Sequence, residues 1–262
     1  MKYLCFVCLL ISCSNKIILE SDSHPGKKYK VFFIGDSMTS DDPGNFSLTD
    51  SSSSKSYGWY LKQMLSNNYE FKNYAVSGVG ISEMNNQMQS ILNEGCDKSS
   101  VNIVCILGCV NNISFSGMKG EDCYDQIKNI HSTLRSNGFK TISISLTSRR
   151  QLDYFTEEQS KLFWKEVRMA DSLFKNNASS FCDYYLDLQT ERIKQRKGRW
   201  VGFAGYEAPT QSSYFLDGCH FSDYGKQRIA LLLKRKLRKI KWLSTKCRRH
   251  KSLKTSSTIY CN

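Results

Sequence analysis

Proline and glycine are scarce in this chain, and it has a single long apolar run. The 262 residues include 3 Pro and 16 Gly, which excludes a collagen-like repeat and a Pro-rich, low-complexity chain. The apolar run follows Met1 and Lys2 and spans about ten residues, too few for an ordinary membrane-spanning helix. Because 40% of the residues are hydrophobic and 12% aromatic, the chain can form a sizeable core, and a disordered chain is excluded.

Acidic residues are missing from the C-terminal end. All 24 Asp and Glu lie in the first 223 residues, whereas 13 of the 37 Lys and Arg follow Asp223. The net charge of +13 therefore belongs to the C-terminal segment. Such a segment predicts contact with an anionic lipid or acidic polysaccharide surface, or else a helix whose basic side chains are simply solvated. We expect no nucleic acid partner, because the sequence has no recognised motif for one.

The first 13 residues have the pattern of an export signal, with one Lys ahead of the apolar run. The end of the run, from Leu10 to Cys13, resembles the site at which bacterial lipoproteins are lipidated on Cys. We expect residues 1–13 to be a signal peptide of the lipoprotein type, with an ordinary secretory signal as the alternative. Residues 14–28 are then a polar tether, and the mature protein is extracytoplasmic, either secreted or anchored to a membrane as a lipoprotein.

Export makes disulfides permissible for the eleven Cys, but their pairing does not follow from sequence. Cys105 lies in an apolar run and is interpreted as a small buried side chain. Cys247 and Cys261 flank the end of the basic tail, where a bond between them would close a terminal loop. Cys105 and Cys109 lack a second pair of ligands, so we expect no metal site.

Apolar runs alternate with amphipathic stretches from residue 29 onward, which predicts one α/β domain with a parallel sheet over residues 29–242, followed by a basic tail over 243–262. The predicted strands are Tyr29–Ile34, Phe71–Val76, Val101–Leu107, Thr141–Leu146 and Tyr184–Leu188. The predicted helices are Tyr57–Leu65, Ser82–Asn93, Asp122–Asn137, Thr156–Asn176 and Ser222 to about Trp242. Two long loops, Asp41–Lys55 and Arg192–Phe215, interrupt this alternation at carboxyl ends of strands, where open sheets bind ligands.

A candidate nucleophile follows the first predicted strand. Ser37 comes directly after Gly35 and Asp36, which places its hydroxyl at the edge of the sheet, although these residue types also form ordinary turns. A serine nucleophile needs a base. Among the four His, His24 lies in the predicted tether, His131 on the polar side of a predicted helix and His250 in the basic tail.

His220 is the remaining candidate base, at the junction between the last loop and the last helix. Asp217 lies three residues earlier, and the intervening Gly218 permits a bend that brings its carboxylate to one imidazole nitrogen. The other nitrogen would then face Ser37. Two further strand ends supply candidate oxyanion donors, the backbone N–H of Gly78 and the side-chain amide of Asn111.

These four blocks, at Gly35–Ser37, Gly78, Gly108–Asn112 and Asp217–His220, resemble those of the SGNH hydrolases, the GDSL-type esterases and lipases. The resemblance covers residues 29 to about 240. It implies a flavodoxin-like three-layer α/β/α sandwich and hydrolysis of acyl esters without a metal or cofactor. It also implies that Ser37 is the nucleophile and an oxyanion donor, that His220 is the base and Asp217 its partner, and that Gly78 and Asn111 complete the oxyanion hole. Asn112 departs from the family, where Asp is usual at this place.

The sequence indicates the substrate less directly than it indicates the fold and the catalytic residues. Three aromatic residues of the long loop before the last helix, Trp200, Phe203 and Tyr206, are suited to stacking on sugar rings, or to ordinary packing of the loop. Since no extended apolar loop is evident for a long acyl chain, a carbohydrate O-acetyl esterase is preferred to a lipase or lysophospholipase. A catalytically inactive SGNH-fold module that binds polysaccharide is the second class of function, and turnover of an acetyl ester would separate it from an esterase.

Overall fold

The computed structural model of the chain describes residues 28–40, 55–146, 155–188, 192–194, 200–202 and 220–255, with the backbone alone for 192–194, 200–202 and 241–255. The described residues contain a five-stranded parallel sheet in the order β2-β1-β3-β4-β5. Its strands are β1 (Lys28–Gly35), β2 (Tyr69–Asn73), β3 (Ser100–Leu107), β4 (Lys140–Ile144) and β5 (Tyr184–Leu186). This is the strand order of the flavodoxin-like fold, so the predicted fold class is confirmed.

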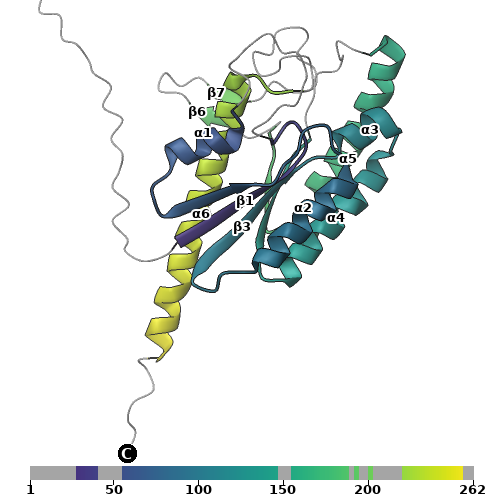
Figure 1. The fold of residues 1–262 in the computed structure, drawn as a ribbon. Helices are drawn as coiled ribbons and strands as arrows, with labels where there is room; N and C mark the ends of the chain where they lie inside the picture. Colours follow the sequence, from purple (N-terminus) through teal and green to yellow (C-terminus); the bar gives the residue numbers. More distant parts are fainter. Residues whose placement is uncertain are drawn as a thin grey trace, which may run out of the picture.

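Helices cover both faces of the sheet (Figure 1). On one side lie α1 (Tyr57–Met64) and α6 (Asp223–Thr255), which contact each other. On the other side lie α2 (Ile81–Glu94), α4 (Gly120–Ser136) and α5 (Glu157–Phe181), with the short α3 (Val110–Ser116) between β3 and α4. The strands β6 (Arg192–Lys194) and β7 (Trp200–Gly202) form a separate antiparallel pair. None of the helices in these described ranges is long and apolar enough to cross a membrane.

The central strands form because their side chains are apolar on both faces. In β1 the residues from Val31 to Gly35 are all buried, and in β3 those from Asn102 to Leu107. Continuous burial of this kind is expected of parallel strands covered by helices on both sides. The helices contribute apolar stripes, as in α5, where Phe163, Val167 and Phe174 are buried. A capping box at Thr156 and Gln159 sets the start of α5.

Several elements differ from the sequence prediction. Strand β2 ends three residues early, because it is an edge strand whose register is set by β1, with Tyr69 stacked on Tyr29 and Val76 exposed. Helix α6 extends to Thr255, so the predicted boundary after residue 242 falls inside a helix. The seven residues of α3 and the β6–β7 pair, within what was predicted to be a continuous loop, were not predicted as regular structure.

Candidate active site

The end of β1 presents Ser37 at the carboxyl edge of the sheet. Strand β1 pairs with β2 on one side and β3 on the other, so the chain leaves the sheet at the point where the strand order reverses, the usual ligand site of such folds. Gly35 is required here because a Cβ would collide with the carbonyl oxygen of Leu107 and with Thr39. After it the chain turns sharply, and the N–H groups of Thr39 and Ser40 donate to the Asp36 carbonyl at 2.9 and 3.0 Å.

Ser37 and His220 meet across the fold. The Ser37 hydroxyl lies 2.9 Å from Nε2 of His220, although 183 residues separate them in sequence. His220 lies three residues before the start of α6. The first turn of this helix is capped by the Ser222 hydroxyl, which accepts from the N–H of Gly225 at 3.1 Å. Ser37 is 9% exposed. This is the geometry in which an imidazole removes a proton from a hydroxyl.

Asp36 is a buried carboxylate beside this pair. Its Oδ1 accepts from the N–H of Met38 at 3.0 Å, whereas Oδ2 is buried without a hydrogen bond from any residue that the structure describes. Burial raises the pKa of Asp36 from 3.8 to about 6, while the Met38 N–H and the positive charge on His220 act in the opposite direction. Asp36 therefore holds a negative charge at neutral pH in surroundings that disfavour it, next to the base.

The predicted oxyanion donor Gly78 lies in a turn between β2 and α2. Its φ of +75° is in the left-handed region that glycine favours. No atom of the described residues lies within 4 Å of the position that a Cβ would occupy there, and Gly78 is exposed. The backbone at Gly78 is therefore accessible to a substrate at the same edge of the sheet as Ser37.

Asn111 and Asn112 lie in the first turn of α3, and their side chains form hydrogen bonds with the backbone just after Gly78. Nδ2 of Asn111 donates to the carbonyl of Val79 at 2.8 Å, and because an amide nitrogen carries two hydrogens, one remains for a substrate oxygen. Oδ1 of Asn112 accepts from the N–H of Ile81 at 2.9 Å. An Asp would offer the same acceptor, so the departure at Asn112 keeps the contact that joins α3 to α2.

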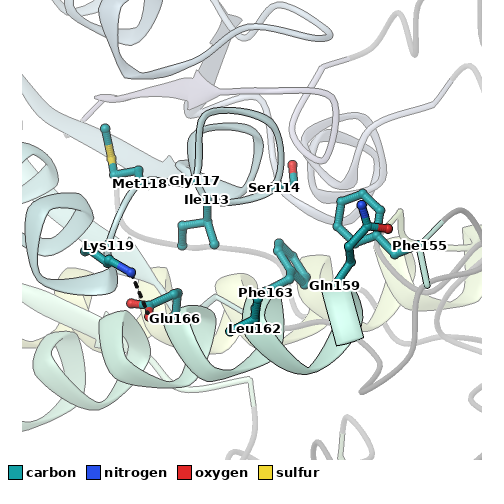
Figure 2. A pocket seen from close by; sticks show the side chains of 10 residues that line it. All are labelled: Ile113, Ser114, Gly117, Met118, Lys119, Phe155, Gln159, Leu162, Phe163 and Glu166. Carbon is teal, nitrogen blue, oxygen red and sulfur yellow. Dashed lines mark ion pairs between the residues drawn. The ribbon is translucent and has the colours of Figure 1, made fainter. Parts of the chain in front are cut away.

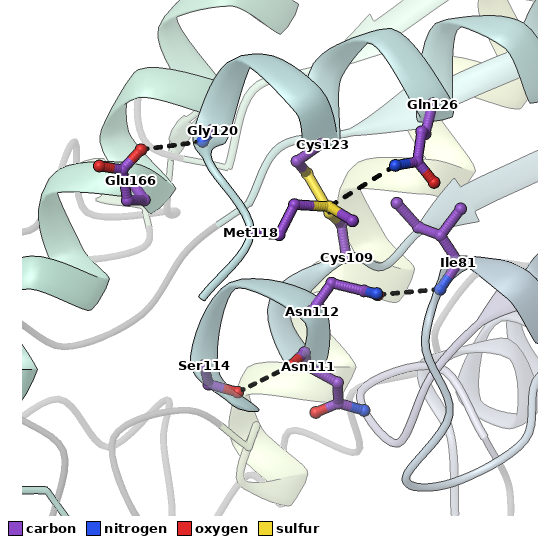
Figure 3. The surroundings of a disulfide bond; sticks show 10 residues. All are labelled: Ile81, Cys109, Asn111, Asn112, Ser114, Met118, Gly120, Cys123, Gln126 and Glu166. Carbon is purple, nitrogen blue, oxygen red and sulfur yellow. Dashed lines mark hydrogen bonds between the residues drawn. A yellow bond between two sulfur atoms is a disulfide. The ribbon is translucent and has the colours of Figure 1, made fainter. Parts of the chain in front are cut away.

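A disulfide joins Cys109, two residues before Asn111, to Cys123 (Figure 3). Cys109 precedes α3 and has a φ of +91°, the one positive φ of a non-glycine residue in the described ranges. Cys123 lies in the first turns of α4. The bond therefore fixes the backbone that leads into the candidate oxyanion residue, and it is a pairing that the sequence did not predict.

A pocket of about 250 Å³ lies between the C-terminal end of α3 and the N-terminal half of α5 (Figure 2). Apolar side chains of Ile113, Phe155 and Phe163 line it, and Lys119 and Glu166 form an ion pair at 3.9 Å on one side. Ser114, also in the lining, donates its hydroxyl to the carbonyl of Asn111 at 3.3 Å. The pocket is thus one helical turn from the candidate oxyanion residue.

Some predicted residues fall outside the described ranges, and one lies in surroundings that differ from the prediction. Asp217 is outside the described residues, so its contact with His220 stays a prediction. The same holds for the roles of Phe203, Tyr206 and Cys13, and of Trp200, whose backbone alone is described. The placement of His131 on a polar helix face was wrong. Its side chain is fully buried and packs edge-on against Phe181 at 5.1 Å, because it lies on the apolar stripe of α4 with Ile127 and Leu134.

Sequence reasoning missed Gln87, which contacts the backbone beside the nucleophile. A signal was present, because Gln87 falls between Met84 and Ile91 at helical spacing, on the buried stripe of α2. A polar side chain in such a stripe needs a buried partner. The Cys109–Cys123 pair had no comparable signal among eleven cysteines.

Comparisons with known proteins agree with this fold. The chain is similar in structure to a member of the lipolytic G-D-S-L family from Veillonella parvula DSM 2008 (TM-score 0.54, 16% identity, 78% of this chain and 95% of that one). It is also similar to a GDSL-like lipase from Bacteroides thetaiotaomicron VPI-5482 (0.54, 14%, 80% and 88%) and to a variant of an acetyl xylan esterase from Geobacillus stearothermophilus (0.52, 13%, 80% and 94%).

Among curated proteins, no sequence matches this one significantly. The family model described as GDSL-like lipase/acylhydrolase matches residues 31–233, which include the end of β1 with its Ser37 turn, the Gly78 turn, Asn111 and His220. The chain belongs to the GDSL-like lipase/acylhydrolase family.

Proposed function

We propose that this protein is an exported serine esterase that hydrolyses short acyl esters, with O-acetyl groups on carbohydrate as the favoured substrate class. The observation that carries the proposal is the 2.9 Å contact between the Ser37 hydroxyl and Nε2 of His220, at the sheet edge where this fold binds ligands. The accessible turn at Gly78 and the Asn111 amide lie on neighbouring strand ends and support it.

In the proposed reaction, Oγ of Ser37 attacks the ester carbonyl carbon while His220 accepts the hydroxyl proton. The carbonyl oxygen becomes an oxyanion, which the N–H groups of Ser37 and Gly78 and the free hydrogen of the Asn111 amide stabilise. His220 then gives its proton to the departing alcohol, and the acyl group remains on Ser37. Water attacks this acyl-enzyme with His220 again as base, which releases the acid and restores the hydroxyl. Asp217 is proposed to orient His220.

A preference for short acyl groups is proposed because the sequence around Ser37 is mostly polar, with Asp36, Thr39 and Ser40 beside it. Each added methylene contributes about 0.8 kcal/mol only where apolar surface receives it. The acetyl xylan esterase from Geobacillus stearothermophilus, which is similar in fold, supports an acetyl ester as the substrate class.

The pocket beside α3 favours a second candidate, an esterase for longer chains. It is smaller than the roughly 300–1,000 Å³ of typical small-molecule sites, yet its apolar lining is one turn from Asn111. If acyl chains enter it, Leu162→Asp should lower kcat/KM for octanoate and leave acetate unchanged, since Leu162 lines the pocket and is 64% exposed. Phe115→Asp is the matched control, because Phe115 is 69% exposed and outside the lining.

The experiment that tests the proposal is a p-nitrophenyl ester series from acetyl to octanoyl, with an acetylated xylan alongside. We expect kcat/KM to be highest for acetate and to fall with chain length, and acetylated xylan to be deacetylated. A maximum at octanoate, lost in Leu162→Asp, would replace the short-chain esterase with a lipase. Absence of turnover together with binding to the polysaccharide would leave an inactive binding module.

We also propose that the enzyme works outside the cytoplasm. The export pattern of residues 1–13 and the Cys109–Cys123 disulfide support an oxidising compartment. If Cys13 is lipidated, the protein from a bacterial host should partition into detergent, and Cys13→Ala should abolish this. A mature N-terminus that begins beyond Cys13, measured by mass spectrometry, would leave secretion but remove the anchor.

The basic end of the chain is proposed to contact an anionic surface. Helix α6 starts beside the active site and its C-terminal end extends past the opposite end of the sheet (Figure 1). Each Lys or Arg close to an anionic membrane contributes about 1 kcal/mol. Salt-sensitive sedimentation with anionic vesicles, compared with neutral ones, tests this contact, and equal sedimentation with both would contradict it.

A further inference from the structure

Gln87 binds the peptide backbone two residues before the nucleophile. The N–H of Gly35 donates to Oε1 of Gln87 at 2.9 Å, and Nε2 of Gln87 donates back to the carbonyl of Gly35 at 3.0 Å. Both bonds are buried, and Gln87 itself is 3% exposed. The side-chain amide of Gln87 supplies a donor and an acceptor together, so it pairs with both the N–H and the carbonyl of Gly35, as a peptide group of a neighbouring strand would.

Gly35 needs this partner because it lies where the sheet ends. The β1–β2 pairing stops at Phe33 and Asn73, two residues before Gly35. Beyond that point the Gly35 carbonyl also accepts from the N–H of Val76 at 3.3 Å. A buried peptide group without partners is costly, and Gln87 takes the place that a longer β2 would have filled.

The chain that leads into α2 carries one of the other two candidate oxyanion donors and binds the other. The loop that leads into it contains Gly78, and the next residue, Val79, accepts the hydrogen bond from Asn111. Its first residue, Ile81, donates to Asn112. Gln87 thus connects the strand end that carries Ser37 to α2, the helix that follows the Gly78 loop, and that loop binds Asn111 of α3 through Val79. A shift of α2 against β1 would change the distance from the Ser37 N–H to the other two donors.

We propose that Gln87 is a positioning residue for the oxyanion hole, which holds the Ser37 turn in register with Gly78 and Asn111. The inference rests on the proposed esterase function. Gln87 does not touch the substrate in this account, so its loss should lower kcat and leave KM nearly unchanged. Misplacement of a catalytic group by about 1 Å costs on the order of 100-fold in rate; we therefore expect a loss of about 10- to 100-fold.

Two substitutions separate positioning from mere packing. Gln87→Met keeps the length of the side chain but makes neither bond, so its kcat relative to wild type should be low at every pH. Gln87→Glu keeps the shape. Its carboxylate form cannot donate to the Gly35 carbonyl, whereas its protonated form both donates and accepts. Because burial favours the protonated form, the ratio of its kcat to that of wild type should rise about tenfold between pH 8 and pH 5.5.

The ratio to wild type isolates the introduced carboxyl group. Titratable groups on the elements packed around α2, including Asp36 after β1 and His131 on α4, are present in both proteins. Gln89→Glu is the matched control, because Gln89 lies on the same helix, is exposed, and bonds to the side chain of Asn93. Its ratio to wild type should stay near one across the same pH range.

The experiment measures kcat and KM for p-nitrophenyl acetate from pH 5.5 to 8, with thermal unfolding recorded for each variant. A low, flat ratio for Gln87→Met and a rising ratio for Gln87→Glu would support the inference. Wild-type kcat in both variants, or a flat ratio for Gln87→Glu, would overturn it; if Gln87→Met does not fold, the profile of Gln87→Glu decides. Absence of Ser37-dependent turnover in the wild type would instead refute the proposed function itself.

Discussion

Replacing Asp36 with Asn should stabilise the folded protein at neutral pH. The Asp36 carboxylate is buried, and one of its oxygens has no hydrogen bond from the described residues. An Asn keeps Oδ1 for the Met38 N–H, which Asp36 binds at 3.0 Å, and it carries no charge. The substitution therefore removes the cost of a buried charge and preserves the turn around Ser37.

The magnitude follows from the pKa of Asp36, which burial raises from 3.8 to about 6. At a pH between these two pKa values, Asp36 is protonated in the folded protein and ionised in the unfolded chain. The free energy of unfolding therefore falls as pH rises through this window, by about 3 kcal/mol in total. Below pH 3.8 the full stabilisation by the bound proton is present, and above about pH 6 it is lost.

The assay is urea unfolding of the wild type and Asp36→Asn from pH 3.5 to 7.5. The unfolding free energy of the variant minus that of the wild type should increase by about 3 kcal/mol as pH rises across this range. Taking the difference removes contributions that both proteins share. At pH 7.5 the variant should also have the lower kcat, because the Asp36 charge attracts the imidazolium that His220 forms. A pH-independent difference would refute a raised pKa for Asp36.

Three further predictions follow from buried groups and from the oxyanion loop. Burial lowers the pKa of His131 from 6.5 to about 3, so stability should fall by up to about 5 kcal/mol as pH drops through that window, and His131→Leu should remove this loss in urea unfolding. Breaking the 14-residue Cys109–Cys123 loop by Cys123→Ala should cost about 3 kcal/mol, measured by thermal unfolding; an unchanged Tm contradicts it. Asn111→Leu should lower kcat for p-nitrophenyl acetate about 100- to 1,000-fold, and wild-type turnover would remove Asn111 from the site.

Most of the sheet and the meeting of Ser37 with His220 could be predicted from sequence. Buried parallel strands are continuous apolar runs, as in β1 and β3, and residues at their carboxyl ends gather at one edge. The edge strand β2 was placed too late because its register depends on β1, through the stacking of Tyr69 on Tyr29. The local hydrophobic pattern of a strand does not indicate which strand it pairs with or in which register.

Features that depend on how two elements pack could not be predicted. His131 is an exception: it was predicted on a polar helix face, although its helical spacing from Ile127 and Leu134 in the sequence already indicates the buried face. The Cys109–Cys123 bond and the contact of Gln87 with Gly35 each join two separate elements. How far one element is shifted along the other depends on their packing, which the local sequence does not specify. Asp217 remains a prediction, since its position lies outside the described residues.

The most direct test of the account measures turnover of p-nitrophenyl acetate by the wild type, Ser37→Ala, His220→Ala and the double variant. Since the two residues act as a unit through one 2.9 Å contact, each single variant should lose nearly all activity, and the double variant should be scarcely worse than either. Retention of most activity by His220→Ala, or losses in the two single variants that multiply in the double, would contradict a shared Ser37–His220 mechanism.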